Sequence, residues 1–253
     1  MISITEQQLE LYMSIFQGRI DVYARRWEKE DRSGYSPAYE FNWDEFLVHK
    51  NKGGSMKDFG NKKLLPLTKE VIKKHLLGQH VVGIYPILPD NTSYFIAADF
   101  DEENWLTDSK SFIRVCEKVG LSAYLERSRS GNGGHAWIFF SESYPCYKSR
   151  QIVLELIRKV FYFSEFEKEV SFDRLFPNQD MLSKAGFGNL IALPLQGKST
   201  ESGNAVFVDP ETTLPFSDQW QFLSGIKKHS VMDLDGIHQS IFSDTTKLPL
   251  NTK

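Results

Sequence analysis

Cysteine is scarce in this sequence, since only Cys116 and Cys146 occur among 253 residues. Two cysteines provide no disulfide framework, and the chain contains no Cys-x-x-Cys pair. This usage is typical of proteins that work in a reducing compartment. The sequence therefore predicts a cytoplasmic location.

Long apolar runs and the residue pattern of a secretory leader are also missing. No stretch approaches the roughly 20 apolar residues that a membrane-spanning helix needs. The segment Met1–Gln8 lacks the basic and apolar regions of a signal peptide. We therefore expect no membrane partner.

Neither sign of charge dominates. The chain has 30 Lys and Arg against 33 Asp and Glu, which gives a formal net charge of -3. This balance excludes binding to nucleic acid through overall positive charge, but it leaves room for a local basic surface. With 41% hydrophobic and 25% charged residues, the composition is that of a globular protein long enough for a large core or two lobes.

The first part of the chain, residues 1–80, is predicted to be a helical and locally basic segment followed by a loop. Apolar residues have largely helical spacing over residues 6–28, with Gly18 as a break point. Residues 50–63 are polar, cationic and rich in glycine, which indicates an exposed loop. Thr68 is a suitable N-cap for a short helix after this loop.

The core is expected over residues 81–228. Residues 81–87 and 94–103 indicate two strands joined by a turn, and Thr107 is predicted to cap the next helix. The other predicted elements are strands at 122–128, 135–140, 169–174, 189–195 and 204–209, and helices at 149–162 and 217–226. This order mixes hairpins with crossovers, so it predicts an α+β fold around a mainly antiparallel sheet. Residues 229–253 are predicted to be a polar tail of one compact domain.

The strand at Tyr94–Glu103 ends in acidic residues. Asp99 and Asp101 are two residues apart, so on a strand both carboxylates point to one face. Two adjacent carboxylates repel each other unless a cation lies between them, and Mg²⁺ or Mn²⁺ prefers such oxygen ligands. The alternative interpretation is a solvated strand end that leads into a turn.

A glycine-rich, basic turn joins the next two strands, between Glu126 and His135. Its glycines let backbone N–H groups approach an anion closely, and its arginine and serine side chains add donors for phosphate oxygens. These side chains are Arg127, Ser128, Arg129 and Ser130. The alternative is a long hairpin turn with a half-buried histidine.

Two later segments add polar side chains at strand positions. Asp173 lies in the strand-like run Val170–Arg174, where it is either a third functional acid or a surface partner of Arg174. Gln196 and Lys198 follow a buried strand, and a lysine there either binds a triphosphate or is solvated. Three carboxylates, a phosphate-binding turn and a histidine in one sheet suggest two-metal phosphoryl or nucleotidyl transfer.

These segments resemble the archaeo-eukaryotic primase superfamily. Its three motifs match Ala98–Asp101, Gly133–His135 and Phe172–Asp173. Longer phrases match one subfamily more specifically, and they lie at residues 18–19, 24–27, 83–86, 126–133, 173–180, 186–196 and 218–220. In these longer phrases the chain most resembles the primase–polymerase domain of TOTE conflict systems and of CRISPR-associated primase–polymerases.

The resemblance implies an RRM-like catalytic half, packed on a smaller α/β module. It also implies that Asp99, Asp101 and Asp173 are catalytic and bind two metal ions, with Asp180 as a competitor of Asp173 for the third position. We prefer Asp173, because Asp180 follows a Pro-Asn turn. The expected nucleotide-binding residues are His135, which contacts the triphosphate, and Arg129, Ser130, Asn132, Gly133, Gln196 and Lys198.

Many relatives carry a cysteine cluster between the N-terminal helix and the strand near residue 83. This chain has no cysteine there, so we expect no structural zinc. The cationic residues 50–63 either hold a template backbone or form a plain solvated loop. Arg19, Arg25 and Arg26 are further candidates for contacts with nucleic acid, with a solvated helix face as the alternative.

The predicted function is that of a DNA primase–polymerase with Mg²⁺ or Mn²⁺ as cofactor. Its expected partners are nucleoside triphosphates and a single-stranded DNA or RNA template, together with helicase or defence-system proteins or domains. One alternative is a non-catalytic RRM-like module in which Trp137 or Phe139 stacks on bases. Another is a metal-dependent nuclease.

Overall fold

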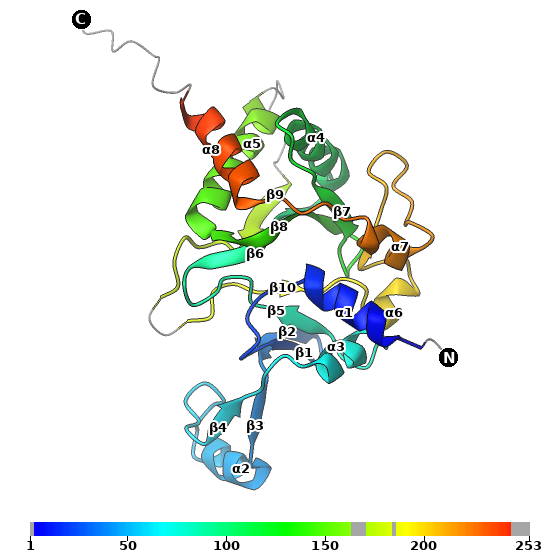
Figure 1. The fold of residues 1–253 in the computed structure, drawn as a ribbon. Helices are drawn as coiled ribbons and strands as arrows, with labels where there is room; N and C mark the ends of the chain where they lie inside the picture. Colours follow the sequence, from blue (N-terminus) through cyan, green and yellow to red (C-terminus); the bar gives the residue numbers. More distant parts are fainter. Residues whose placement is uncertain (1–2, 163–170, 184–185, 244–253) are drawn as a thin grey trace, which may run out of the picture.

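The computed structural model describes residues 3–162, 171–183 and 186–243 of the chain (Figure 1). Within these residues, two antiparallel sheets and a small separate strand pair combine with helices. The predicted α+β class with antiparallel sheets is therefore confirmed. None of the described helices combines the length and the apolar character needed to cross a membrane.

The larger sheet has the strand order β11-β7-β8-β6-β9. Its strands are β6 (Thr92–Asp101), β7 (Tyr124–Arg127), β8 (Gly133–Pro145), β9 (Phe172–Phe176) and β11 (Val206–Phe207). Its helices are α4 (Trp105–Lys118), α5 (Cys146–Tyr162) and α8 (Val231–Ser243). Helices α4 and α5 pack on β6 and β8, and α8 packs on α5, so all three lie beside the sheet in Figure 1. From β6 to β9 the chain runs strand–helix–strand–strand–helix–strand.

The smaller sheet has the order β10-β5-β1-β2. Its strands are β1 (Ala24–Lys29), β2 (Arg32–Pro37), β5 (Val82–Ile84) and β10 (Ile191–Ala192). The remaining helices of this half are α1 (Glu6–Ile15), α3 (Lys69–Leu76), α6 (Gly197–Thr200) and α7 (Gln219–Ser224). Helix α1 packs on α3 and α7, and α3 packs on β5.

A small unit projects from the smaller sheet, at the bottom of Figure 1. It consists of β3 (Tyr39–Phe41), α2 (Trp43–Asn51) and β4 (Lys62–Leu64). Phe41, Phe46 and Phe59 form its aromatic cluster, with ring centroids 5.4–6.3 Å apart. The predicted exposed loop at 50–63 is therefore shorter than expected, because its ends belong to α2 and β4.

One apolar core joins the two halves. Phe16, just after α1, packs its ring 5.4 Å from Trp137 and 5.7 Å from Phe139, which both belong to β8. Phe16 also stacks on Phe207 of β11 at 6.3 Å. All of these rings are buried. Because the same core holds both sheets, side chains from the two halves have fixed positions relative to each other.

Two sequence-based predictions of elements are wrong. Residues 24–28, expected to be helical, belong to β1, because Ala24 and Arg25 pair with β5 and the whole strand pairs with β2. Helix α4 begins at Trp105 rather than after Thr107, directly beyond a turn in which Glu102 has φ 69°. The predicted strands β5 and β6 and the turn between them are present, and the two strands belong to different sheets.

Part of the predicted polar tail is helical, and residues 244–253 of this tail lie outside the described part of the chain. Val231–Ser243 form helix α8, whose Leu234 is buried. Ser230 and Asp233 exchange side-chain and backbone hydrogen bonds at its start. This Ser-x-x-Asp pair is a capping-box pattern from which the start of the helix could have been predicted. The predicted strand at 169–174 is present as β9 from Phe172, and residues 169–170 lie outside the described part of the chain.

Helix α3 begins as predicted. The Thr68 side chain accepts a hydrogen bond from Val71 N, and Gly78 after the helix has φ 77°. On this helix the buried His75 accepts a hydrogen bond from Val82 N at Nδ1, so its Nε2–H donates to the Pro194 carbonyl at 2.9 Å. Burial lowers the pKa of His75 to about 4. The imidazole is therefore neutral at physiological pH.

This pKa predicts a pH dependence of stability. The unfolded chain binds a proton at His75 near pH 6.5, but the folded protein does so only near pH 4, so acid favours unfolding. Between these pH values wild type should lose up to about 3 kcal/mol of stability through this residue. Urea unfolding of wild type and His75→Gln at several pH values measures the effect. The stability advantage of wild type should shrink as the pH falls from 6.5 to 4, and a constant difference would contradict the assignment.

Candidate functional site

The two acids of strand β6 lie on one face of the larger sheet. The side chains of Asp99 and Asp101 alternate with Phe100, which is fully buried on the other face. Asp101 lies opposite Gly133 of β8, and a Cβ at that glycine would clash with the Asp101 carboxylate and with the Phe100 carbonyl. Glycine at position 133 is therefore required for space beside this acid. Its carbonyl also accepts a hydrogen bond from Ser128 N at 2.9 Å, which closes the turn.

A β-bulge places the third acid. Asp99 pairs with Arg174 of β9 and Phe100 pairs with Phe172, so Asp173 is the extra residue between them. In a regular ladder Asp173 would point away from Arg174, to the apolar face. A bulge re-aims a side chain in this way and is frequent next to active sites. Arg174 Nε donates to Asp173 Oδ2 at 2.6 Å.

Asp99, Asp101 and Asp173 together form an acidic cluster that fits a metal ion. One carboxylate oxygen from each lies within 4.8 Å of the others. Burial of Asp99 and the charges of Asp101 and Asp173 raise the pKa of Asp99 to about 6, although nearby His135 opposes the shift. A bound cation would remove this electrostatic strain. Carboxylate oxygens alone suit Mg²⁺ or Mn²⁺ rather than a metal that prefers sulfur ligands.

His135 occupies a polar row that crosses three strands. It pairs with Asp99 of β6 on one side and with Glu126 of β7 on the other. Its Nδ1–H donates to Glu126 Oε2 at 2.7 Å, and its Nε2 lies 3.4 Å from Asp99 Oδ1. Burial disfavours the charged imidazole, but Glu126, Asp99 and Asp101 outweigh it and raise the pKa of His135 to about 9. The histidine is thus a cation fixed beside the acidic cluster.

Sequence reasoning did not assign a role to Glu126. This carboxylate is 2% exposed and also accepts a hydrogen bond from Trp137 Nε1 at 3.0 Å. It therefore fixes the orientation of the His135 ring through Nδ1, so that Nε2 faces Asp99. The available signal was a carboxylate inside the apolar strand of residues 124–127, since a buried acid needs a partner. Arg174 was likewise named only as a partner of Asp173.

The predicted phosphate-binding turn lies between two cavities. Gly131 in this turn has φ 82°, and the Ser128 and Ser130 hydroxyls are 3.0 Å apart. Ser130 Oγ also accepts a hydrogen bond from Asn132 N at 3.3 Å. On one side, Asn132 and Asp101 line a cavity of about 550 Å³. On the other side, Arg129 reaches a second cavity.

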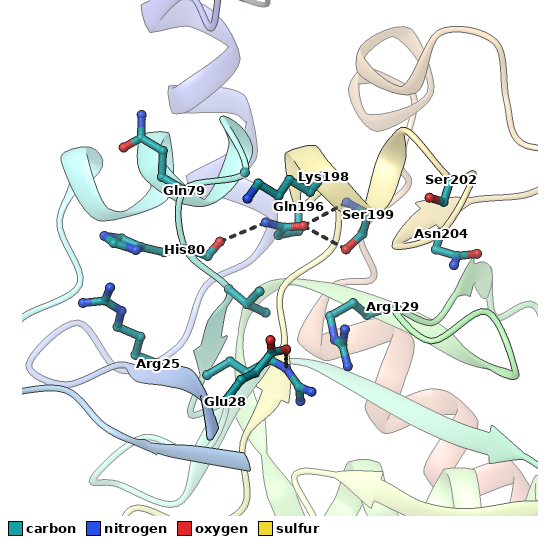
Figure 2. A pocket seen from close by; sticks show the side chains of 13 residues that line it. Arg25, Glu28, Gln79, His80, Arg129, Gln196, Lys198, Ser199, Ser202 and Asn204 are labelled. Carbon is teal, nitrogen blue, oxygen red and sulfur yellow. Dashed lines mark hydrogen bonds and ion pairs between the residues drawn. The ribbon is translucent and has the colours of Figure 1, made fainter. Parts of the chain in front are cut away.

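This second cavity, here called the basic pocket, is drawn in Figure 2 and has a volume of about 490 Å³. It joins Arg129 from the larger sheet to side chains from β1, from the end of α3 and from α6. The cationic side chains that line it are Arg25, Arg26, Arg129 and Lys198, with His80 beside them. Lys198 is exposed, so its ammonium group is accessible to a ligand. The structure thus brings four predicted cationic residues to one place.

Gln196 also lines the basic pocket, but its amide already has partners (Figure 2). Its oxygen accepts hydrogen bonds from Ser199 N at 2.9 Å and from Ser199 Oγ at 2.8 Å, and its nitrogen donates to the His80 carbonyl. The amide therefore caps α6 and ties it to the segment before β5. This geometry favours a role for Gln196 in shaping the pocket.

Two other candidates lie elsewhere. Arg19 pairs with Asp21 at 2.6 Å, and its guanidinium lies 5.0 Å from the Phe187 ring centroid. Only 12% of the Arg19 side chain is exposed, so its observed contacts are structural. Asp180 pairs with Arg150 at 2.7 Å and is absent from the acidic cluster. The preference for Asp173 over Asp180 as the third acid agrees with this geometry.

Comparison with known proteins identifies the family. The family model for the archaeo-eukaryotic primase domain of the TOTE conflict system matches residues 7–237. The chain belongs to this family. The match includes both sheets, the acidic cluster and the basic pocket of this primase domain. The predicted family is confirmed.

Two further comparisons add less. No curated protein matches the sequence of this primase domain. Among solved structures, the polymerase domain from Mycobacterium tuberculosis Ligase D in complex with DNA is similar, with a TM-score of 0.45 and 12% sequence identity. The alignment covers 93% of this chain and 85% of that chain.

The acidic cluster predicts stabilisation by divalent cations. At a concentration about 100 times the dissociation constant, Mn²⁺ should raise the unfolding temperature by about 5–10 °C, because it binds only the folded cluster. Asp99→Ala/Asp101→Ala should abolish this shift. Without metal the double variant should be at least as stable as wild type, because carboxylate repulsion and the burial of Asp99 are relieved. Equal Mn²⁺ shifts in the two proteins, measured by thermal melting, would place the metal elsewhere.

Proposed function

We propose that this primase domain is a DNA-directed nucleotidyltransferase that joins nucleoside triphosphates to a 3′-hydroxyl on a single-stranded template. The observation that carries the proposal is the convergence of Asp99, Asp101 and Asp173 in a chain of the archaeo-eukaryotic primase family. The RRM-like half of the fold would hold these acids, and primer synthesis without a pre-existing primer is part of the proposal.

The three carboxylates would hold two Mg²⁺ or Mn²⁺ ions. Such ions would lower the pKa of the attacking hydroxyl and neutralise charge on the leaving pyrophosphate. The protein contributes rigidity. Asp99 and Asp101 are fixed by a strand with ladder partners on both sides, and Asp173 is fixed by the bulge opposite Phe100. Such fixed placement of charge avoids reorganisation during the reaction.

The nucleotide would bind between the acidic cluster and the basic pocket. His135, held by Glu126, offers a positive charge to a triphosphate oxygen beside the cluster. Arg129 and Lys198 provide further cationic donors in the pocket, and Ser130 and Asn132 lie in the turn between the two sites. Arg25 and Arg26 extend the positive charge outward along β1. A triphosphate and a template backbone are both polyanions that suit this surface.

The RRM-like binding module is the weaker alternative. Trp137 and Phe139, the aromatics proposed to stack on bases, are fully buried in the core and are not available. A nuclease would use a similar acidic cluster. The proximity of the basic pocket favours a nucleotide substrate over a nuclease reaction that needs no triphosphate.

A template-directed synthesis assay tests the proposal. With labelled primer, single-stranded DNA, nucleoside triphosphates and Mn²⁺, wild type should lengthen the primer, and Asp99→Ala/Asp101→Ala should show no synthesis. A parallel reaction without primer tests initiation. Shortening of the labelled strand would indicate a nuclease instead. Synthesis by the double variant at the wild-type rate would overturn the mechanism.

A further inference from the structure

Strands β1 and β2 form a two-stranded ribbon at the edge of the smaller sheet. Their register places Arg25 opposite Ser36, Trp27 opposite Gly34 and Lys29 opposite Arg32. Directly opposed residues share a face, and alternate residues of one strand do as well. Arg25, Trp27, Lys29 and Arg32 therefore lie on a single face of the ribbon, and all four are exposed. We call this surface the ribbon face.

Trp27 lies at the centre of the ribbon face. A Cβ built at Gly34 would lie 3.0 Å from Trp27 Cζ2 and 3.3 Å from Cε2, so the indole covers the glycine backbone. The side chain is nevertheless 44% exposed. An indole that rests on a glycine of the neighbouring strand has one side supported and the other side open. Such a ring is a ready platform for stacking.

The charges around Trp27 are positive and accessible. Among the described residues, no ion pair joins Arg25, Lys29 or Arg32 to an acid. The acid within β1, Glu28, points to the opposite face and pairs there with Arg26 at 3.0 Å. Two acids, Glu30 and Asp31, lie in the turn at the tip of the ribbon. The ribbon face itself carries three cations around one aromatic ring.

The ribbon face meets the basic pocket at Arg25. Arg25 belongs to both, since it lines the pocket together with Arg129 and Lys198 (Figure 2). Arg26 and Glu28 line the same pocket from the other face of β1. From Arg25 the ribbon face runs along β1 toward the tip of the ribbon. A strand of nucleic acid that leaves the pocket at Arg25 would meet Trp27 next and then Lys29.

We propose that the ribbon face binds single-stranded nucleic acid, with a base stacked on Trp27 and backbone phosphates paired with Arg25, Lys29 and Arg32. Cations interleaved with an exposed aromatic side chain are the usual composition of a single-strand binding surface, because every base has a face for stacking and every nucleotide a phosphate. The identification of this strand as the template rests on the proposed function.

A binding assay without catalysis tests this surface. The probe is a fluorescein-labelled oligothymidylate, titrated by anisotropy in EDTA without nucleotide. Trp27→Ala should weaken binding by at least about fivefold, and Trp27→Phe should recover part of the loss. Lys29→Ala/Arg32→Ala should also weaken binding and should lower the slope of log K against log salt concentration by about one for each contact removed.

Trp43→Ala is the matched control. Trp43 is 59% exposed on α2, outside the ribbon, and its variant should bind the oligonucleotide like wild type. If Trp27→Ala also lowers the unfolding temperature, Lys29→Ala/Arg32→Ala decides the question, because these exposed side chains contribute no packing to the core. Affinities and salt slopes equal to wild type in both ribbon variants would overturn the proposal.

The result also separates this proposal from the proposed function. Asp99→Ala/Asp101→Ala should bind the oligonucleotide at least as tightly as wild type, since it retains the ribbon. A wild-type protein that binds through Trp27 but synthesises nothing would contradict the polymerase alone. If synthesis requires Asp99 and Asp101 but the variants of Trp27, Lys29 and Arg32 bind the oligonucleotide like wild type, the ribbon proposal alone is contradicted.

Discussion

The register of strand β6 between β8 and β9 is the constraint on which the site depends. Asp99 lies opposite His135 on one neighbour and opposite Arg174 on the other. Because side chains alternate along a strand, a slip of one residue would turn both β6 acids into the apolar core. The core opposes such a slip, since Phe100 is buried between the two acids and packs 5.7 Å from Phe112 of α4. Packing on one face therefore fixes the chemistry on the other.

The basic pocket depends on a second constraint, the junction between the two sheets. The Pro194 carbonyl accepts hydrogen bonds from Tyr12 Oη at 2.6 Å and from His75 Nε2 at 2.9 Å. Just beyond it, a Cβ at Gly197 would lie 2.5 Å from the Leu76 carbonyl, so the start of α6 sits directly against the end of α3. This contact places Lys198 across the pocket from Arg129. The acidic cluster thus belongs to one sheet, but the pocket needs both.

The acidic cluster could be predicted from the sequence because Asp99 and Asp101 are two residues apart on a strand and therefore share a face. The family motifs supplied Asp173 as the third acid. Sequence reasoning could not foresee the bulge that re-aims Asp173, since a bulge is set by pairing with Phe100 and leaves no signature in the local sequence. Strand β1 was misread as helix for the same reason, because its partners β5 and β2 decide its conformation. The role of Glu126 depends on the register of β7 and β8, which places it opposite His135 and which the local sequence does not specify.

The most direct test of the acidic cluster compares two aspartates that lie close together in the sequence. Asp173 lies in the acidic cluster, and Asp180 pairs with Arg150 outside it. Primer extension with Mn²⁺ should be about a hundredfold slower or worse in Asp173→Asn, since loss of a metal ligand costs at least as much as loss of its supporting partners. Asp180→Asn should extend primers at close to the wild-type rate. Normal synthesis by Asp173→Asn and loss of synthesis in Asp180→Asn would contradict the site described here.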